Sequence, residues 1–411
     1  MNSSVTPGAA APRDDFNDPN LFLEPHPFLH KLRAEAPVHF SQALDAWVLT
    51  RYQDVDQALN DPRLSGLEET KRFDALPPAQ REMLLPLRRC FERWAGRSSI
   101  ADHDRFRHLL GRRFTPSAAR SLGPRIQAIL DDLMNAAVSQ GSVDVARDLA
   151  RPMAMRVVAE LILDIPGVPV DMLLQRGSDI AGMLEKGEEA QLLRGQEAVL
   201  ALIERLRVEI HAHRREGRGG IVGVLLTALD EGIVRDEDEL FANCIMFLVV
   251  GYHTTANLLV SGLQLLFDHP AERARLLQDF NLLPTAIDEM MRFHGSVASV
   301  RRMVVDSFTL RGRRLLEGQT VTLVLAAANR DPAVYPDPDR FDIGRRDNRH
   351  LGFTVGPYAC MGKHVANLEA QAFFRTMLTR FPRLRPRDPR PRWTRFWPLG
   401  CELRTLPVLF D

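Results

Sequence analysis

The sequence lacks the paired cysteines of a disulfide framework or a structural zinc site. Only four cysteines occur in 411 residues, at Cys90, Cys244, Cys360 and Cys401, and none belongs to a C-x-x-C pair. An excess of charge is also missing, because Lys plus Arg and Asp plus Glu both number 53. A chain without net charge has no field that would draw it to nucleic acid or anionic lipid. The sequence therefore predicts neither partner, and a reducing compartment.

Targeting signals and repeats are absent as well. The first residues, MNSSVTPGAAAPRDD, lack the basic and apolar regions of a signal peptide, and no repeat of fixed period is visible. No glycine-rich dinucleotide fingerprint follows a predicted strand. What is present is ordinary for a soluble globular protein, with 45% hydrophobic and 26% charged residues. We expect a cytoplasmic protein with a substantial core.

Residues 240–267 contain no Asp, Glu, Lys or Arg and are long enough to span a bilayer. Polar residues such as Asn243, Asn257 and Gln264 interrupt this stretch, and no aromatic or basic belt flanks both ends. It therefore predicts a long helix buried inside a large domain, and no membrane contact.

The alternation of helical and strand-like patterns predicts a mainly α fold with minor β. Helical periodicity dominates residues 102–239, short strands are expected within 38–50 and 300–325, and a last helix is expected over 361–380. Residues 1–20, rich in Pro, Ala and Asp, predict a flexible lead-in. No linker divides residues 21–411, which we expect to form a single domain.

Near the carboxyl end, the stretch HLGFTVGPYACMGKHVANLE places Cys360 between Gly356 and Gly362, just before a helix. The glycines would let a flat group lie against the loop, and the free N–H groups of the helix favour a thiolate. A shielded thiolate is an axial ligand that promotes O–O cleavage at haem iron. Two alternatives stay open: a small buried thiol, or a nucleophile with His364 as its base.

FTVGPYACMG resembles the haem-thiolate signature of the cytochrome P450 family, F-x-x-G-x-x-x-C-x-G, with Phe353, Gly356, Cys360 and Gly362 in register. The resemblance covers nearly the whole chain and is closest to soluble bacterial members. It implies a single large helical domain with small sheets, and a haem b between the long central helix and the cysteine-loop helix. Cys360 would be the iron ligand, and Phe353 would shield its sulfur.

A second match is DEMMRF, which supplies Glu289 and Arg292 of the family's E-x-x-R pair. Residues three apart share a helix face, so the pair is either an ordinary surface ion pair or the buried pair of the family. The resemblance implies the buried form, joined by an arginine from a following loop. We predict Arg340 in PDPDRF for that role. The network would fix the loop that carries the cysteine.

A third match concerns cations for the two haem propionates. His103 and Arg107 in HDRFR resemble the family's H-x-x-x-R segment, and Arg302 and His350 match further propionate-binding positions. A residue of this kind taken alone is more often a solvated surface residue, but the four together, in the family's order, favour the propionate-binding role. Tyr358 stands where the family often has His or Arg, and its hydroxyl would donate one neutral hydrogen bond to haem.

The fourth match, VVGYHTTANLL, resembles the family's oxygen-activating stretch. Gly251 would leave room for dioxygen, and Thr254 would help hold a proton-carrying water, unless its hydroxyl bonds back to its own helix. His253 replaces the family's acid. It is a proton shuttle, a contact for a polar substrate, or a residue that faces away.

The resemblance implies a monooxygenase that hydroxylates or epoxidises a hydrophobic small molecule (terpenoid, steroid, fatty-acid or polyketide-like) in secondary metabolism. Dioxygen would be the co-substrate, and a ferredoxin or flavodoxin with its NAD(P)H-dependent reductase would bring electrons to a basic face that includes Arg112, Arg113 and Lys363. We expect a monomer. The expected pocket residues, for which core packing is the competing role, are Met172, Ile180, Val249, Val250, Val297, Ala298, Phe396 and Trp397.

Two other functions stay open. His253 invites a haem-thiolate enzyme with peroxide-driven or dehydrating chemistry. A haem-binding sensor without turnover is the other alternative, and Thr254 beside the expected oxygen site argues against it.

Overall fold

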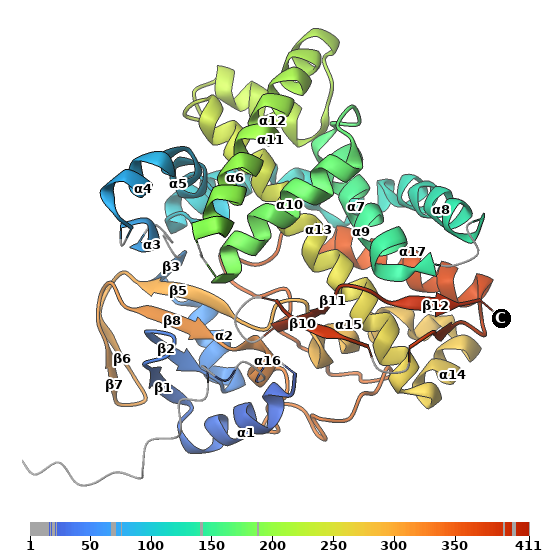
Figure 1. Cartoon of the computed structure of the whole chain (residues 1–411). Helices are drawn as coiled ribbons and strands as arrows, with labels where there is room; N and C mark the ends of the chain where they lie inside the picture. Colours follow the sequence, from blue (N-terminus) through green and yellow to red (C-terminus); the bar gives the residue numbers. More distant parts are fainter. Residues whose placement is uncertain are drawn as a thin grey trace, which may run out of the picture.

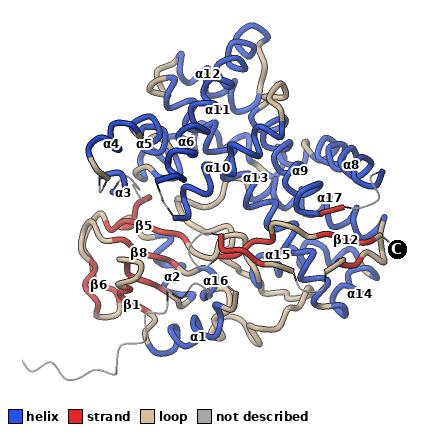
Figure 2. Tube along the Cα trace, viewed as in Figure 1, coloured by secondary structure: helices blue, strands red, loops and turns tan. Residues whose placement is uncertain are grey.

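The computed structural model describes residues 16, 18, 21, 23–66, 71–74, 76–139, 143–186, 189–388, 391–396 and 400–410. Helices fill most of the molecule, and the strands lie in the lower half of the view, with the larger group at the left, as Figures 1 and 2 show. The predicted mainly α fold with minor β is confirmed. Of the lead-in predicted for 1–20 only Phe16 and Asp18 are described, so that prediction lies largely outside the described residues, and the single domain over 21–411 stays a prediction.

Seventeen α-helices are seen in the described residues: α1 (Pro25–Glu35), α2 (Tyr52–Asn60), α3 (Lys71–Asp74), α4 (Pro78–Met83), α5 (Leu85–Glu92), α6 (Ile100–Leu110), α7 (Pro116–Ser121), α8 (Gly123–Ser139), α9 (Arg151–Arg156), α10 (Val170–Lys186), α11 (Glu189–Glu216), α12 (Gly220–Asp230), α13 (Glu237–Asp268), α14 (Pro270–Gln278), α15 (Leu283–Phe293), α16 (Leu325–Ala328) and α17 (Lys363–Arg380). π-Helical turns over Val145–Ala150 and Val157–Leu163 extend α9 at both ends.

Capping side chains explain where the helices around the later site begin. Ser99 Oγ accepts a hydrogen bond from Asp102 N at 3.2 Å at the start of α6, and Asp236 Oδ1 accepts one from Glu239 N at 2.8 Å at the start of α13. The last helix begins at Lys363, two residues later than predicted, with Gly362 as its N-cap.

The strands form one larger sheet and three small ones. The larger sheet has the order β1-β2-β8-β5-β3, and its neighbours are antiparallel except for β2 and β8. Its edge strand β3 pairs Gly66 with Arg302 of β5. The strands are β1 (Val38–Ser41), β2 (Ala46–Leu49), β3 (Leu64–Gly66), β4 (Val143–Asp144), β5 (Val300–Val304), β6 (Phe308–Leu310), β7 (Arg313–Leu315), β8 (Thr320–Leu323), β9 (Arg385–Pro386), β10 (Trp393–Phe396), β11 (Gly400–Leu403) and β12 (Pro407–Leu409).

Helix α13 runs through the middle of the helical part (Figure 1). Its length and composition would allow it to cross a membrane, yet 67% of its most apolar window is buried inside the fold. At Gly262 an added Cβ would lie 2.7 Å from Phe374 Cζ of α17 and 2.8 Å from Met290 Sδ of α15. The glycine therefore allows close packing of three helices. As predicted, this is a core helix.

Candidate active site

One cavity of about 460 Å³ brings together most of the residues that the sequence analysis singled out. It lies between α6, α13, β5, α17 and the loop before α17. The predicted residues in its lining are His103, Arg107, Gly251, Thr254, Arg302, Phe353, Tyr358, Cys360 and Gly362. Most of the remaining wall is apolar and includes Trp94, Phe106, Leu110, Phe114, Val158, Ile162, Met246, Phe247, Val250, Leu258, Met291 and Val297.

The cysteine loop is shaped by its backbone. Cys360 N donates to Phe353 O at 2.9 Å. Gly356 has a φ of 75°, and a Cβ there would lie 2.5 Å from Leu59 O, so only glycine fits where the loop passes the end of α2. Thr354 has a φ of 54°, a left-handed conformation that is rare for a β-branched residue.

The Cys360 side chain is exposed to the cavity. Burial within the protein raises the pKa of its thiol, while the N–H groups of Gly362 and Lys363 and the charges of Arg107 and Lys363 act in the opposite direction. The predicted N–H donors are thus present but do not outweigh burial. A metal cation on the sulfur would make the thiolate the stable form. His364 is exposed and outside the cavity lining, which removes the base from the nucleophile alternative.

Two arginines of the cavity wall, Arg107 and Arg302, have no anionic partner among the described residues. Arg302 is 7% exposed, and no carboxylate of the described residues lies within ion-pair distance of it. Burial lowers the pKa of Arg302 to about 10. Arg107 donates to Ala359 O of the cysteine loop at 2.6 Å. Because an unpaired buried charge is costly, this edge of the cavity is prepared for an anion.

His103 lies between two carbonyl oxygens. Its Nδ1 is 3.0 Å from Ala95 O and its Nε2 is 3.0 Å from Pro357 O. Burial lowers the pKa of the ring. A neutral imidazole has a single N–H and donates to only one of the two carbonyls.

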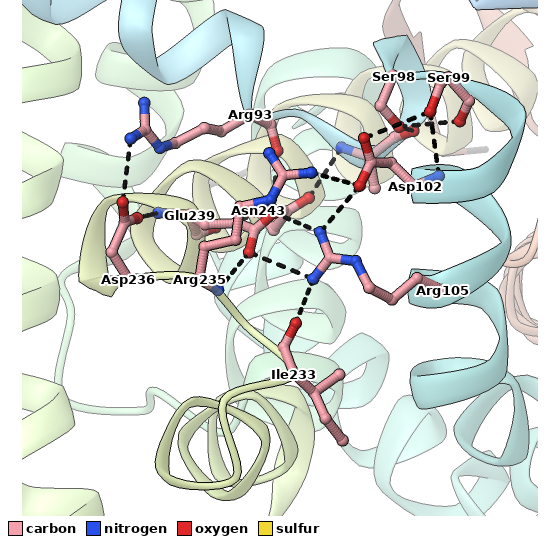
Figure 3. A network of polar contacts seen from close by, with 11 residues as sticks. Arg93, Ser98, Ser99, Asp102, Arg105, Ile233, Arg235, Asp236, Glu239 and Asn243 are labelled. Atoms are coloured by element: carbon pink, nitrogen blue, oxygen red, sulfur yellow. Dashed lines mark hydrogen bonds and ion pairs between the residues drawn. The ribbon is translucent and has the colours of Figure 1, made fainter.

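A polar network holds the segment before α6 against α13 (Figure 3). Asn243 Oδ1 accepts from Ala95 N at 3.0 Å, and Asn243 Nδ2 donates to Arg93 O at 2.9 Å. Glu239, 2% exposed, accepts from Arg105 at 2.6 Å. Because Ala95 O lies 3.0 Å from His103 Nδ1, the network also fixes the backbone that positions this histidine.

Glu289 and Arg292 form a buried pair, as the resemblance implied. Arg292 donates to both carboxylate oxygens of Glu289 at 2.7 and 2.9 Å. The third arginine is Arg345, whose Nε is 3.2 Å from a Glu289 oxygen. The prediction of Arg340 is wrong: its side chain is 64% exposed, and only its carbonyl joins the network by accepting from Arg292 at 3.1 Å. The loop turns so that position 345, not 340, faces the helix.

Two of the expected propionate contacts differ from their prediction. His350 is absent from the described cavity lining, and its Nε2 lies 3.4 Å from Asp288 Oδ1 of α15. The Tyr358 ring lies in the lining, but its hydroxyl donates to Ser98 O at 3.0 Å and accepts from Gly66 N at 2.7 Å. The phenol proton predicted for haem is therefore already used within the protein.

On α13, Gly251 and Thr254 line the cavity. The hydroxyl of Thr254 donates to Val250 O at 2.8 Å, so it bonds back to its own helix. An added Cβ at Gly251 would lie 2.7 Å from Val158 Cγ2, so this glycine lets α13 pack against the π-helical turn after α9.

His253 faces away from the cavity. Its Nε2 lies 2.5 Å from Tyr252 Oη, and a hydrogen bond to the backbone of Gly177 in α10 also acts on its ring. Burial lowers the pKa of His253 to about 3. Of the three alternatives for His253, this geometry supports the one in which it faces away, and it gives no support to a shuttle or a substrate contact.

Only some of the expected pocket residues line the cavity. Val250 and Val297 line the cavity, whereas Met172, Ile180, Val249 and Ala298 do not. Ile180 and Val249 are buried in the main core, and Ala298 packs in the cluster beside α1. Phe396 is placed only as the last residue of β10, and Trp397 lies outside the described residues.

Sequence reasoning missed Glu369, the one carboxyl group in the described cavity lining. It is 2% exposed, and its Oε2 has no hydrogen-bond partner among the described residues. Burial raises the pKa of Glu369 well above its usual value, which favours the protonated carboxyl group. The available signal was an acid on the buried stripe of α17, between Val365 and Phe373.

Known proteins resemble this chain in sequence and in fold. A family model described as Cytochrome P450 matches residues 201–396. Cytochrome P450 107B1 of Saccharopolyspora erythraea is 34% identical, covering 89% of this chain and 89% of its own length. The chain belongs to the cytochrome P450 family. Cytochrome P450 monooxygenase PikC of Streptomyces venezuelae is 32% identical over 88% of this chain and 85% of its own. The solved structure of CalO2 has a TM-score of 0.87 at 28% identity and covers 98% of this chain and 99% of its own.

The predicted cytochrome P450 fold and enzyme class are thereby confirmed. Cytochromes P450 use haem and dioxygen, and receive their electrons from redox partners. The cavity fits haem, a flat apolar macrocycle with two carboxylates. Cys360 supplies a sulfur on one wall, and the buried Arg302 supplies a cation without an anionic partner.

The buried His253 predicts acid sensitivity. Because its pKa is lowered from 6.5 to about 3, unfolded chains bind a proton below pH 6.5 that folded chains do not. The contribution of His253 to the free energy of unfolding is present above pH 6.5 and is lost as the pH falls toward 3. At pH 5.5 the loss is about 1.4 kcal/mol. Urea unfolding between pH 8 and 5 should therefore show a shallower pH slope for His253→Gln than for the wild type. The exposed His211→Gln is the control; equal slopes in all three proteins would contradict the prediction.

Proposed function

We propose that this cytochrome P450 binds haem b through Cys360 and inserts one atom of dioxygen into a C–H or C=C bond of a hydrophobic small molecule. The observation that carries the proposal is a free cysteine sulfur facing an apolar cavity whose edge holds the buried, unpaired Arg302. When bound, haem supplies dioxygen activation, in which one oxygen atom enters the substrate and the other leaves as water, with two electrons and two protons consumed.

The protein's own residues bind and orient the cofactor. Cys360 provides the iron ligand, and the N–H groups of Gly362 and Lys363 stabilise its sulfur. Arg107 and Arg302 would pair with the propionates. Phe353 in the lining keeps water from the sulfur.

Two polar groups of the cavity wall come from different helices. The Thr254 hydroxyl on α13 donates to Val250 O, so toward the cavity it can accept a hydrogen bond. Glu369 lies on α17, the helix that follows the cysteine loop. His253 is buried, neutral and turned away, so its geometry gives no support to proton delivery from the position that carries the family's acid.

The apolar wall favours a hydrophobic substrate (terpenoid, steroid, fatty-acid or polyketide-like), consistent with a role in secondary metabolism. Relatives include cyclomarin C epoxidase CymV of Salinispora arenicola and 6-deoxyerythronolide B hydroxylase of Saccharopolyspora erythraea, whose names specify different substrates. Their diversity supports the class of molecule rather than one compound.

The test begins with a library of hydrophobic compounds screened for the spectral shift that follows displacement of water from the iron. A compound that binds is then turned over under ¹⁸O₂ with NAD(P)H and redox partners. We expect one ¹⁸O atom in the product. Product without ¹⁸O, or turnover only with peroxide, would favour the peroxide-driven alternative.

We further propose a cytoplasmic monomer that receives electrons from a ferredoxin or flavodoxin at the exposed basic residues Arg112, Arg113 and Lys363. Reversing two charges, Arg112→Glu with Arg113→Glu, should slow reduction at low salt by about tenfold, because steering between charged surfaces is lost. Stopped-flow reduction at low and high salt measures this. The matched control is Arg313→Glu with Arg314→Glu, an equally exposed pair on β7. Equal rates for both double variants would contradict the docking site.

A further inference from the structure

Tyr358 lies two residues before Cys360 and makes contacts that its position in the sequence did not predict. Its hydroxyl donates to Ser98 O at 3.0 Å and accepts from Gly66 N at 2.7 Å, and Ser65 Oγ lies 3.3 Å away. Gly66 belongs to the edge strand of the larger sheet, so the phenol satisfies a backbone N–H that no further strand pairs. One hydroxyl thus joins the cysteine loop to β3 and to the segment before α6.

Each of these bonds ends beside a residue that lines the haem site. Gly66 is the partner of Arg302 in the β3–β5 register. Ser98 lies just before α6, the helix that carries His103. The hydroxyl therefore fixes the backbone that carries the Arg302 and His103 side chains.

The ring of Tyr358 contacts those two side chains directly. The Arg302 guanidinium carbon lies over the ring, 4.6 Å from its centre, and the His103 ring centre is 4.5 Å away at an interplanar angle of 37°. Arg302 otherwise donates to its neighbour Arg301 O at 2.9 Å, and no described carboxylate pairs with it. A cation over an aromatic face is attracted to it, most strongly where water is excluded.

We propose that Tyr358 is a positioning residue for the haem propionates: its ring holds Arg302 and His103 in place, and its hydroxyl anchors their strands and loops. It does not bind haem through its hydroxyl. The inference rests on the proposed haem site. An aromatic support for Arg302 and His103 takes the place of the hydrogen bond to haem predicted for Tyr358.

The test is the rate of haem transfer from the loaded protein to excess apomyoglobin, followed by the Soret band. Tyr358→Phe removes the hydrogen bonds and keeps the ring; we expect release to be about tenfold faster. Tyr358→Leu also removes the ring, and we expect a further fivefold increase, in line with the loss of a cation–π contact. The control is Tyr335→Phe: this buried tyrosine has Arg292 5.2 Å from its ring centre, but its hydroxyl has no hydrogen-bond partner among the described residues. We expect no change for it.

Two further variants distinguish positioning from other roles. Tyr358→His introduces an imidazole that could bind a propionate directly. If direct binding is the role of this position, the variant will release haem no faster than the wild type. That result would overturn the proposal. Combining Tyr358→Leu with Arg302→Leu should give less than the product of the two single effects, because Tyr358 acts through Arg302. Multiplicative effects would also overturn it. Failure of the wild type to bind haem would instead refute the proposed function.

Discussion

Replacing Glu289 with Gln is expected to lower the free energy of unfolding by about 3–5 kcal/mol, because the uncharged amide leaves a buried guanidinium without its counter-charge. Glu289 and Arg292 are both fully buried, and the carboxylate also accepts from Asp342 N at 2.9 Å and from Asn348 Nδ2 at 3.1 Å. The pair therefore holds the loop over 340–348, which leads to the cysteine loop. Urea unfolding followed by circular dichroism measures the change, and haem content should fall with it.

The chain supplies a matched control in the same geometry. Glu204 and Arg207 are also three residues apart on a helix, with a distance of 2.9 Å, but their side chains are 72% and 52% exposed. Glu204→Gln should cost less than about 1 kcal/mol. Similar losses for Glu204→Gln and Glu289→Gln would show that burial does not decide the strength of this pair.

Replacing Arg302 with Leu is expected to have opposite effects on the haem-free and haem-loaded protein. Without haem, the variant removes an unpaired buried charge, so the free energy of unfolding should rise by about 1 kcal/mol or more. With haem, it loses charge-assisted hydrogen bonds to a propionate, and haem release should be roughly 10- to 100-fold faster.

Unfolding of both forms and haem transfer to apomyoglobin measure the two effects separately. Arg302→Lys, which keeps the charge without the planar fork, should fall between Leu and the wild type in haem release. A haem-free Arg302→Leu protein that is less stable than the wild type would mean that Arg302 serves packing and not the cofactor.

The helical spacing of α13 does not decide which of its side chains reach the cavity. The lining includes Met246, Phe247, Val250, Gly251, Thr254, Thr255 and Leu258, so adjacent residues share one wide face of the helix. His253 lies beyond that face, beside Tyr252 and the backbone of Gly177 in α10. The family pattern drew attention to position 253, and only the packing against α10 shows that its side chain turns away.

The contacts of loop residues could not be predicted from the sequence, because loops have no periodicity. Arg340 and Arg345 lie in one loop without periodicity, and only the path of the chain determines which guanidinium reaches Glu289. Tyr358 could be recognised as a departure from the pattern, but its hydrogen bonds to Gly66 and Ser98 join segments that are 292 and 260 residues apart. Motifs with fixed spacing, such as Cys360 with its glycines, were found because local backbone geometry constrains them.

The central claim is that the Cys360 sulfur is the ligand of a haem iron. The most direct measurement is the absorbance difference spectrum of the purified, reduced protein with and without carbon monoxide. A thiolate ligand predicts a strongly red-shifted Soret band that disappears in Cys360→Ser and persists in Cys401→Ser. A correctly folded, haem-loaded wild type without that band, or a Cys360→Ser variant that keeps it, would contradict the account.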